Sequence, residues 1–363
     1  MKKAIWVTLS MLLIFLSGCG TNQANTSDTG GASNVENTTS GTEEKVEPTK
    51  LKFSYFPALH TMVVFVAEQA GFFEQENLDV EMVYTDKGSL QPPMLISGEV
   101  DAATVDITSI ATANAQGKEL LHVFPTTENM SMNLVVRNEK LEELGVSVDD
   151  PIEKKLEALG EMTFGITGPN APTDIYTRFL LTEGGYDPNK DVGMVSLGSA
   201  GNLLAALKSG QIDAFLLTPP TPNQPELDGY GTVFIKSSVG EVPELKNYPY
   251  QGVAFRKDWA EENGDVVKRF VRALINANDL IKENPEEAKE YLKAYFEDMT
   301  DEALTAGMND MIPSLPEDGM LTEEFVDNYL TLNKELGILD LEELPSAAEG
   351  ELWTNQYVEE VQE

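Results

Sequence analysis

The sequence predicts an α/β protein of two doubly wound lobes, joined by two crossover strands with a ligand cleft between them. Apolar strand-like segments alternate with helix-like segments over residues 51–124 and again over 162–217, an order typical of largely parallel sheets. Residues 94–102 and 206–214 also share a pattern, with Ser-Gly at a helix end and an aspartate before a small-residue strand. Two lobes built on one supersecondary unit explain this likeness, and chance similarity of two turns is the alternative. A chain of 363 residues can form two cores.

The first lobe is expected over residues 51–132 and 252–363. It opens with a strand, a helix and a parallel strand, and Gly71 closes that helix. Pro92 lies in the first turn of the next helix, where its missing N–H costs nothing, and Asp106 can cap the helix after it. The expected strands are 51–56, 80–84, 102–105 and 120–124, and the expected helices are 62–70, 90–97 and 110–116.

The second lobe is expected over residues 133–251, entered by a strand at 133–137 and left by a strand at 250–256. Its other expected strands are 162–166, 193–197 and 212–217, and its helices are 175–182 and 203–209. A long amphipathic helix is expected over 265–284, and the acidic residues 285–363 are expected to be helical and to cover the outside of the first lobe. Ligands bind beyond the carboxyl ends of the strands in such sheets, so the polar turns there are the expected site.

The first 50 residues predict targeting and membrane attachment rather than a folded domain. Two lysines precede an apolar run at residues 4–16 that is too short to span a bilayer comfortably, and Leu-Ser-Gly-Cys follows at 16–19. This predicts a lipoprotein signal peptide over 1–18 and lipidation of Cys19, with palmitate as the fatty acid; an ordinary cleaved signal is the alternative. Residues 19–50 are polar and predict a flexible tether. A single cysteine excludes an internal disulfide and a cysteine-based metal cluster.

The charge balance excludes several partners. The formal net charge is −36, from 25 basic and 61 acidic residues, and such a field repels nucleic acid and anionic lipid head groups. We therefore expect no nucleic-acid partner and a membrane association that comes from the lipid on Cys19 alone. A monomer is expected.

Four segments in order carry a resemblance to a known family. They are Gly71-Phe72-Phe73-Glu74, the turn at 97–102, the segment 206–214 and the stretch 255–288. The sequence resembles the substrate-binding proteins of ABC importers in the nitrate, sulfonate, taurine and thiamine-precursor group, which are periplasmic binding proteins of a type II-like fold. The likeness covers about residues 50–295. It implies two lobes that close on one small molecule outside the cytoplasm, crossings near 129–137 and 249–255, and delivery to an ABC permease with a cytoplasmic ATPase.

The candidate ligand-binding residues are polar or aromatic side chains at the expected strand ends and crossings. They are Phe56, His60, Asp86, Asp106, Thr108, Glu128, Thr167, Asn170, Ser199, Asn202, Tyr250 and Gln251. Some have a structural alternative: Phe56 could be core, while Asp106, Ser199 and Asn202 could only cap helices. His122 lies inside an apolar strand and is expected to be a satisfied core residue. Two histidines are too sparse for zinc, and no cofactor is expected.

The residues of these turns favour one ligand class. They contain carboxylates and amides, and Lys87 is their only cation. A ligand with N–H donors and a flat face, such as an aminopyrimidine or another nitrogen heterocycle, suits such a site. A sulfonate, taurine-like or nitrate ligand held by helix N-termini is the alternative.

Two other classes of function remain open. A pyrimidine-synthesising enzyme of a related fold is described as using a histidine and a pyridoxal cofactor. No lysine here is placed convincingly for a Schiff base, and no serine elbow or phosphate loop occurs, so we expect no enzyme. A surface sensor or adhesive lipoprotein could use the same fold, and gene neighbours would separate it from an importer component.

Overall fold

The computed structural model describes residues 47–363. The expected signal peptide, Cys19 and the expected tether up to residue 46 lie outside the described residues. Residues 49 and 50, assigned to the tether from the sequence, are the first two residues of a strand instead. Within the described part of the chain, no helix combines the length and the apolar character needed to cross a membrane.

The first sheet has the strand order β2-β1-β3-β10-β4. Its strands are β1 (Thr49–Tyr55), β2 (Leu78–Tyr84), β3 (Ala102–Val105), β4 (Leu120–Pro125) and β10 (Gly252–Arg256). Strand β1 runs parallel to β2 and β3, whereas β10 runs antiparallel to both of its neighbours. Helices around it are α1 (Met62–Gln69), α2 (Phe72–Gln75), α3 (Gln91–Ser97), α4 (Ile107–Ala115), α10 (Lys257–Glu262), α11 (Gly264–Glu283) and α12 (Pro285–Leu292).

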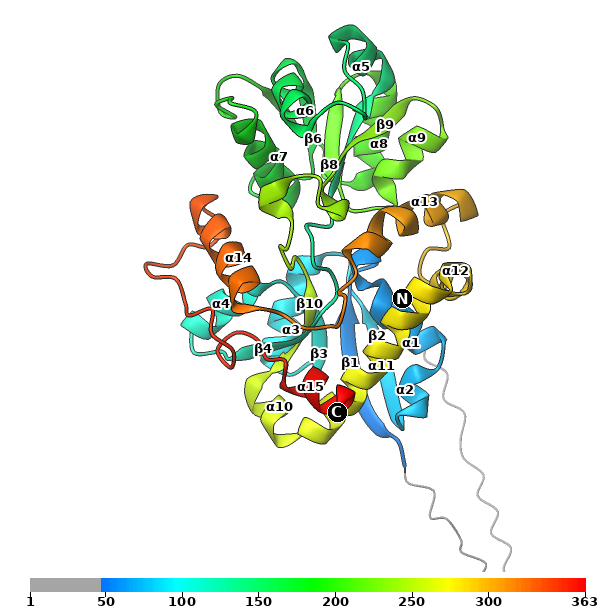
Figure 1. Cartoon of the computed structure of the whole chain (residues 1–363), viewed down its shortest axis with the longest axis vertical. Coiled ribbons are helices and arrows are strands. Elements are labelled where there is room, and N and C mark those ends of the chain that lie inside the picture. Colours follow the sequence, from blue (N-terminus) through cyan, green and yellow to red (C-terminus); the bar gives the residue numbers. More distant parts are fainter. Residues whose placement is uncertain (1–46) are drawn as a thin grey trace, which may run out of the picture. The chain divides into compact units, whose positions relative to one another are not determined.

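The second sheet has the strand order β7-β6-β8-β5-β9, and Figure 1 labels its strands β6, β8 and β9 among the helices of the second lobe. Its strands are β5 (Asn133–Arg137), β6 (Thr163–Ile166), β7 (Gly193–Ser196), β8 (Ala214–Leu217) and β9 (Gly231–Lys236). Its helices are α5 (Asn138–Leu144), α6 (Ile152–Ala158), α7 (Pro172–Glu183), α8 (Ala200–Ser209) and α9 (Gln224–Leu227). Here β5 is the antiparallel strand. The prediction of two α/β lobes is confirmed, and both sheets are mixed because one strand in each enters from a crossing.

The chain passes between the sheets at residues 126–132 and 237–251. These crossings are not strands: the first is irregular and the second contains two short 3-10 turns. The strands that follow them, β5 and β10, take the fourth place in their sheets. Most of the residues of 126–132 are buried, so the lobes are joined by packed segments.

The repeated Ser-Gly-x-x-Asp pattern forms the same turn in both lobes. Asp101 Oδ2 accepts a hydrogen bond from Lys52 N at 2.9 Å, and Asp213 Oδ2 accepts one from Thr163 N at 3.0 Å. The Asp101 N–H in turn donates to the Lys52 carbonyl, and the Asp213 N–H donates to the Thr163 carbonyl. Each aspartate therefore ties a helix-to-strand turn to the neighbouring parallel strand, β1 in the first sheet and β6 in the second, which gives the sequence repeat a structural cause.

An arginine supports each of these turns, with different partners. Arg256 Nη1 donates to the carbonyls of Leu95 and Val100, at 2.9 and 3.0 Å. Arg137 Nη2 donates instead to Asp213 Oδ1 at 2.9 Å. Asp213 therefore accepts a backbone hydrogen bond and also forms an ion pair with Arg137, whereas Asp101 accepts only a backbone hydrogen bond.

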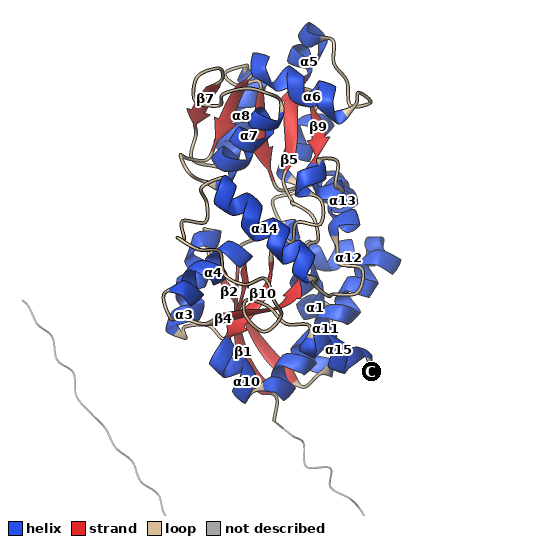
Figure 2. Cartoon of the chain, turned by 60° about the vertical axis from the view of Figure 1, so that its left-hand side comes forward, coloured by secondary structure: helices blue, strands red, loops and turns tan. Residues whose placement is uncertain are grey.

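The C-terminal segment continues with α13 (Asp301–Met311), α14 (Glu323–Glu335) and α15 (Gln356–Gln362). As expected, α12 and α15 pack on α11 in the first lobe. Helices α13 and α14 differ from the expectation, because α13 also packs on α9 of the second lobe and Asn333 of α14 accepts a hydrogen bond from Tyr176 of that lobe (Figure 2). Asp310 of α13 accepts a hydrogen bond from Lys236 Nζ at 2.6 Å, and α14 supplies side chains to a site described below.

Both described histidines are buried without full hydrogen bonding. His122 is 1% exposed, and neither of its ring nitrogens has a hydrogen-bond partner among residues 47–363, so the expectation of a satisfied core residue was wrong. Its ring packs on the backbone of Gly252, where an added Cβ would lie 1.6 Å from Nε2. Burial lowers the pKa of His122 to about 3 and the pKa of His60 to about 4. Both rings are therefore neutral at pH 7.

We predict that Asp213→Ala lowers the free energy of unfolding more than Asp101→Ala does. The first change removes a backbone acceptor and the closer carboxylate partner of the partly buried Arg137, which keeps only the exposed Glu139 at 3.4 Å, at a cost of about 2–3 kcal/mol. The second removes one hydrogen bond, at a cost of about 1 kcal/mol. Urea unfolding of the two variants measures the difference, and equal losses would contradict the assignment.

We also predict a histidine contribution to acid sensitivity. Because the pKa of His60 is lower in the folded chain than in the unfolded one, its contribution is complete above pH 6.5 and is lost as the pH falls towards 4. Between pH 7 and 5 the wild type should lose about 2 kcal/mol more than His60→Phe. Urea unfolding of both proteins at the two pH values tests this, and parallel losses would show that His60 does not contribute.

Candidate functional site

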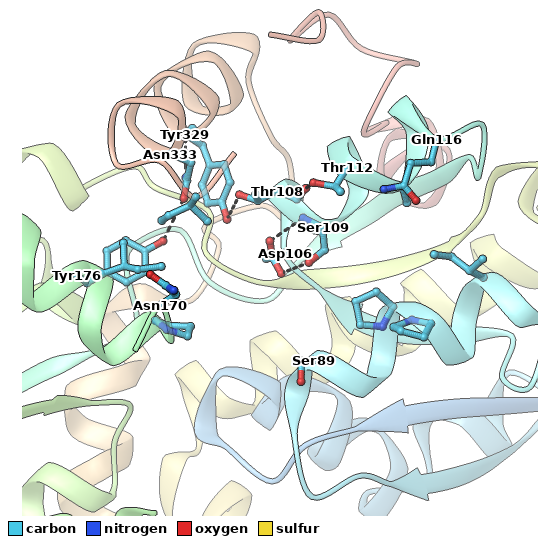
Figure 3. Close-up of a pocket in the computed structure, with 17 residues that line it drawn as sticks. Ser89, Asp106, Thr108, Ser109, Thr112, Gln116, Asn170, Tyr176, Tyr329 and Asn333 are labelled. Atoms are coloured by element: carbon cyan, nitrogen blue, oxygen red, sulfur yellow. Dashed lines mark hydrogen bonds between the residues drawn. The ribbon is translucent and has the colours of Figure 1, made fainter. Parts of the chain in front are cut away.

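A cavity of about 460 Å³ lies between the lobes. Three groups of residues line it (Figure 3). The first lobe contributes the end of the β2 loop and one face each of α3 and α4, the second lobe contributes the start of α7, and the C-terminal segment contributes α14. Polar side chains in the lining are Ser89, Asp106, Thr108, Ser109, Thr112, Gln116, Asn170, Tyr176, Tyr329 and Asn333. The carboxyl ends of β3 and β6 thus face one common space.

Asp106 is the first-lobe carboxylate at the cavity. It follows β3 in an extended conformation and caps α4, because Oδ1 accepts from Ser109 N at 2.8 Å and Oδ2 accepts from Ser109 Oγ at 2.7 Å. A carboxylate has about four acceptor positions, and these bonds use two. The remaining ones can accept hydrogen bonds from a ligand.

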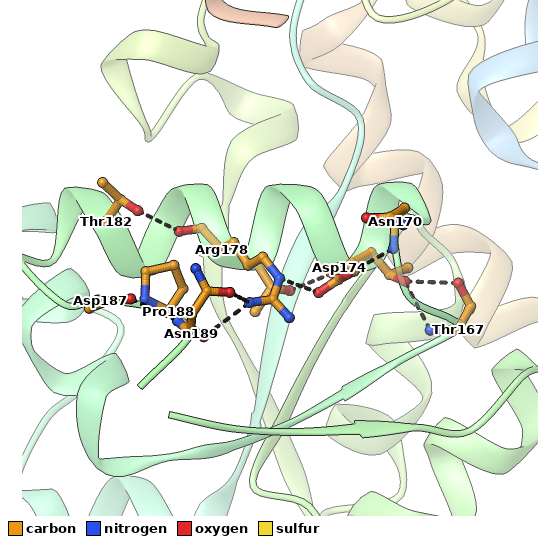
Figure 4. A network of polar contacts seen from close by, with 10 residues as sticks. Thr167, Asn170, Asp174, Arg178, Thr182, Asp187, Pro188 and Asn189 are labelled. Carbon is orange, nitrogen blue, oxygen red and sulfur yellow. Dashed lines mark hydrogen bonds and ion pairs between the residues drawn. The ribbon is translucent and has the colours of Figure 1, made fainter. Parts of the chain in front are cut away.

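The start of α7 is a rigid polar network (Figure 4). Asp174 Oδ2 accepts from Asn170 N at 2.8 Å, and Oδ1 accepts from Arg178 Nε at 2.6 Å. Thr167 N donates to Thr173 Oγ1 at 2.9 Å. Asn170 has a φ of +61°, a conformation that asparagine tolerates better than most residues. The network fixes the loop that carries Asn170 to the cavity.

The electrostatics of the lining favour positive or donor groups. Among the described residues, none that lines this cavity is a lysine or an arginine. Of the three helices that begin at it, α4 has Asp106 at its N-cap and α7 has Asp174, paired with Arg178, in its first turn, whereas α3 has no acidic residue in its first turn. The Asp106 carboxylate occupies the N-terminus of α4, where an anion would otherwise be stabilised.

Buried tyrosines form the wall beside α7 and α14. Tyr176 and Tyr248 share a hydrogen bond between their hydroxyls at 2.7 Å, and the Tyr248 and Tyr329 rings lie 4.4 Å apart. Burial raises the pKa of all three tyrosines well above the usual value. They therefore act as neutral hydroxyls and flat apolar surfaces.

Several of the candidate residues from the sequence meet here. Asp106, Thr108 and Asn170 line the cavity. Tyr250 lies behind it, with its ring 6.2 Å from Tyr176 and 6.2 Å from His60. Thr167 belongs to the network that supports Asn170.

The other candidates do not line the cavity. Ser199 is the N-cap of α8, since its Oγ accepts from Asn202 N at 3.4 Å, so the capping alternative holds for Ser199. Asn202 is the third residue of α8, and its Nδ2 donates to Leu197 O at 2.7 Å. Glu128 accepts from Glu317 N at 2.8 Å, and burial raises its pKa.

Three more candidates lie at other places. Asp86 is exposed, Phe56 is half-buried just after β1, and neither is part of the lining. Gln251 accepts from Thr126 through its backbone carbonyl, so its residue type does not decide that contact.

Sequence reasoning missed most of the lining, and among the missed residues are Tyr176, Tyr329, Asn333 and Ile338. Tyr176 was expected only as the second residue of the helix 175–182, and Pro172 at the start of α7 shows in retrospect that it lies close to the strand end. The other three belong to a segment far away in sequence, and no local pattern connects it to the cavity.

Comparison with known proteins agrees with this architecture. Residues 44–295 match the model of the NMT1-like family. Among curated relatives, the nitrate/nitrite binding protein NrtA of Nostoc sp. is 24% identical over 283 residues, covering 73% of this chain and 62% of that protein. The formylaminopyrimidine-binding protein of Halalkalibacterium halodurans is 24% identical over 292 residues, covering 79% of this chain and 78% of that protein.

Solved structures share the fold. The periplasmic nitrate-binding protein NrtA of Synechocystis PCC 6803 superposes with a TM-score of 0.67 at 17% identity, covering 87% of this chain and 88% of that one. The aliphatic sulphonate binding protein SsuA of Escherichia coli gives 0.66 at 15% identity, covering 85% and 99%. The two mixed five-stranded sheets are thus those of the type II periplasmic binding protein fold, and the chain belongs to the NMT1-like family.

Proposed function

We propose that this chain is an extracytoplasmic solute-binding protein that captures one small molecule between its lobes and delivers it to an ABC importer. The observation that carries the proposal is the cavity between the lobes, lined by polar groups at the carboxyl ends of β3 and β6. The names of several relatives, which bind nitrate, bicarbonate or formylaminopyrimidine, support it. An ABC permease with its cytoplasmic ATPase would be the partner of the monomeric chain. A ligand that contacts both lobes favours their closed arrangement.

The ligand class that the lining supports best is an aminopyrimidine or another nitrogen heterocycle. Asp106 offers a carboxylate to N–H donors, Asn170 offers an amide, and Tyr176 and Tyr329 add aromatic rings. The cavity volume of about 460 Å³ is in the range of small-molecule sites. The formylaminopyrimidine-binding relative shows that family members can bind this chemistry.

A small anion is the second candidate, favoured by the similarity to nitrate- and bicarbonate-binding proteins. The site gives it little support, because an anion would approach Asp106 without a cationic partner in the described lining. This chain also spans only 62% of the nitrate-binding relative and 60% of the bicarbonate-binding one. We therefore rank nitrate, sulfonate and taurine-like ligands below the heterocycle.

Binding is a better proposal than catalysis. Within residues 47–363, no lysine lines the cavity, and a Schiff base to a pyridoxal cofactor requires one. The sensor alternative uses the same binding step and differs only in the partner.

We further propose that the protein is held at the membrane, facing outside the cytoplasm, by a lipid on Cys19. This rests on the sequence Leu-Ser-Gly-Cys at residues 16–19. Cys19→Ala should move the protein from the membrane fraction to the soluble fraction and abolish labelling with palmitate. Labelling that persists in the variant would contradict the proposal.

The ligand proposal predicts a specific effect of Asp106→Asn. Asparagine can still cap α4 through its amide oxygen, but it loses the charge that strengthens a hydrogen bond from a ligand N–H. Titration calorimetry with a formylaminopyrimidine should show binding to the wild type and about tenfold weaker binding to the variant. Ser199→Ala, which removes the cap of α8 away from the cavity, should keep the wild-type affinity.

The same titrations discriminate the anion alternative. Nitrate, bicarbonate and ethanesulfonate should bind weakly or not at all to the wild type. Tight binding of any of them, strengthened by Asp106→Asn, would replace the heterocycle with an anion as the ligand.

A further inference from the structure

Helix α14 lies outside the part of the chain that matches the family, yet it reaches the cavity. The match covers residues 44–295, whereas α14 spans Glu323–Glu335. Tyr329 and Asn333 of this helix, and Ile338 just beyond its end, belong to the lining. Figure 3 shows the first two beside Tyr176 and Thr108. The cavity therefore has a wall that the family match does not include.

On the first-lobe side, α14 packs against α4. The Thr108 hydroxyl donates to the Tyr329 hydroxyl oxygen at 3.2 Å. Thr108 and Tyr329 are 7% and 1% exposed, so this bond is shielded from bulk water. It connects α14 directly to Thr108, which lies two residues after Asp106 in the sequence.

On the second-lobe side, Asn333 makes the connection. Its Nδ2 donates to the Tyr248 hydroxyl and to Tyr329 O, and its Oδ1 accepts from the Tyr176 hydroxyl at 3.4 Å. Asn333 is fully buried. Tyr176 lies on α7 and Tyr248 in the second crossing, so one side chain links the C-terminal segment to both.

This pattern is more than a cover over an apolar patch. A covering helix needs only apolar contacts, whereas α14 places an amide and a hydroxyl where buried groups of both lobes require partners. Loss of the Tyr329 hydroxyl leaves the buried Thr108 hydroxyl without its acceptor on α14. Loss of the Asn333 amide removes one partner of the Tyr176 hydroxyl, which keeps its bond to Tyr248. Helix α14 thus contributes to the orientation of Thr108 and Tyr176 at the cavity, and Ile338 limits the space beside them.

We propose that α14 is the third wall of the ligand site. In this proposal, which rests on the proposed binding function, Tyr329 and Asn333 are positioning residues that hold Thr108 and Tyr176 towards the ligand. Ile338 is a specificity-determining residue that sets the size of the substituent accepted. Ligand choice is then determined in part by the segment beyond residue 295.

The test compares two probes on the full chain by calorimetry: a formylaminopyrimidine, and an analogue that carries a longer alkyl substituent. Ile338→Ala should shift the ratio of the two dissociation constants at least fivefold towards the larger probe. Tyr329→Phe, which keeps the ring and removes one hydroxyl, should weaken both probes three- to tenfold. Asp327→Asn, an exposed change on the same helix, should stay within twofold of the wild type for both.

A general loss of stability would weaken both probes equally and leave their ratio unchanged, so the ratio separates a wall from a merely structural helix. If the wild type binds the probes and Ile338→Ala leaves the ratio unchanged, the proposal is overturned while the binding function stands. If the wild type binds nitrate or ethanesulfonate instead, the heterocycle proposal fails. The affinities of the same variants for nitrate and ethanesulfonate then test whether α14 is a wall of the site. An unchanged ratio of the two dissociation constants overturns that proposal.

A second measurement needs no ligand. In hydrogen–deuterium exchange of the ligand-free chain, Tyr329→Phe and Asn333→Leu should raise exchange in α4 and α7 at least fivefold. Exchange in α8, which contributes no residue to the cavity lining, should stay unchanged. Exchange in the Asp327→Asn variant should match the wild type in all helices. Unchanged exchange in α4 and α7 would overturn the proposal even if none of the probes binds.

Discussion

The placement of β5 and β10 is the constraint on which the rest of the structure depends. Each follows a crossing and enters the interior of a sheet antiparallel to its neighbours. A strand hydrogen-bonded on both sides cannot shift without losing its register. The crossings at 126–132, which is mostly buried, and 237–251, which is partly buried, therefore hold the two sheets with the ends of β3 and β6 towards one space, and Asp106 and Asn170 both line that space because of it.

The negative charge in the cavity lining is a consequence of helix capping. Asp106 satisfies an N–H group at the start of α4 and adds a carboxylate to the cavity lining, whereas the buried Asp174 accepts from Asn170 N and is paired with Arg178. In the proposed function, the Asp106 carboxylate disfavours an anion, and its remaining acceptor positions suit a ligand with N–H donors. The carboxylate that caps α4 is thus also the one proposed to select the ligand.

Much of the fold follows from the sequence, because local signals agree with the final structure. The alternation of strands and helices and the repeated aspartate turn could be predicted from the sequence. The approximate places of the crossings could be predicted too, although the crossings are irregular rather than strands. The site was readable only in part. Asp106 and Ser199 both cap helices after strands, yet only Asp106 lines the cavity, and no local feature distinguishes them. Asn333 depends on contacts with residues 85 and 157 positions away, which no pattern of neighbouring residues encodes.

The central claim is that residues of both lobes and of α14 surround one small-molecule ligand. A crystal structure of the chain grown with a formylaminopyrimidine tests this most directly. The account predicts electron density between α4, α7 and α14, with a ligand nitrogen within hydrogen-bond distance of the Asp106 carboxylate. Density for the ligand on the outer surface of either lobe, with the space between the lobes unoccupied, would contradict it.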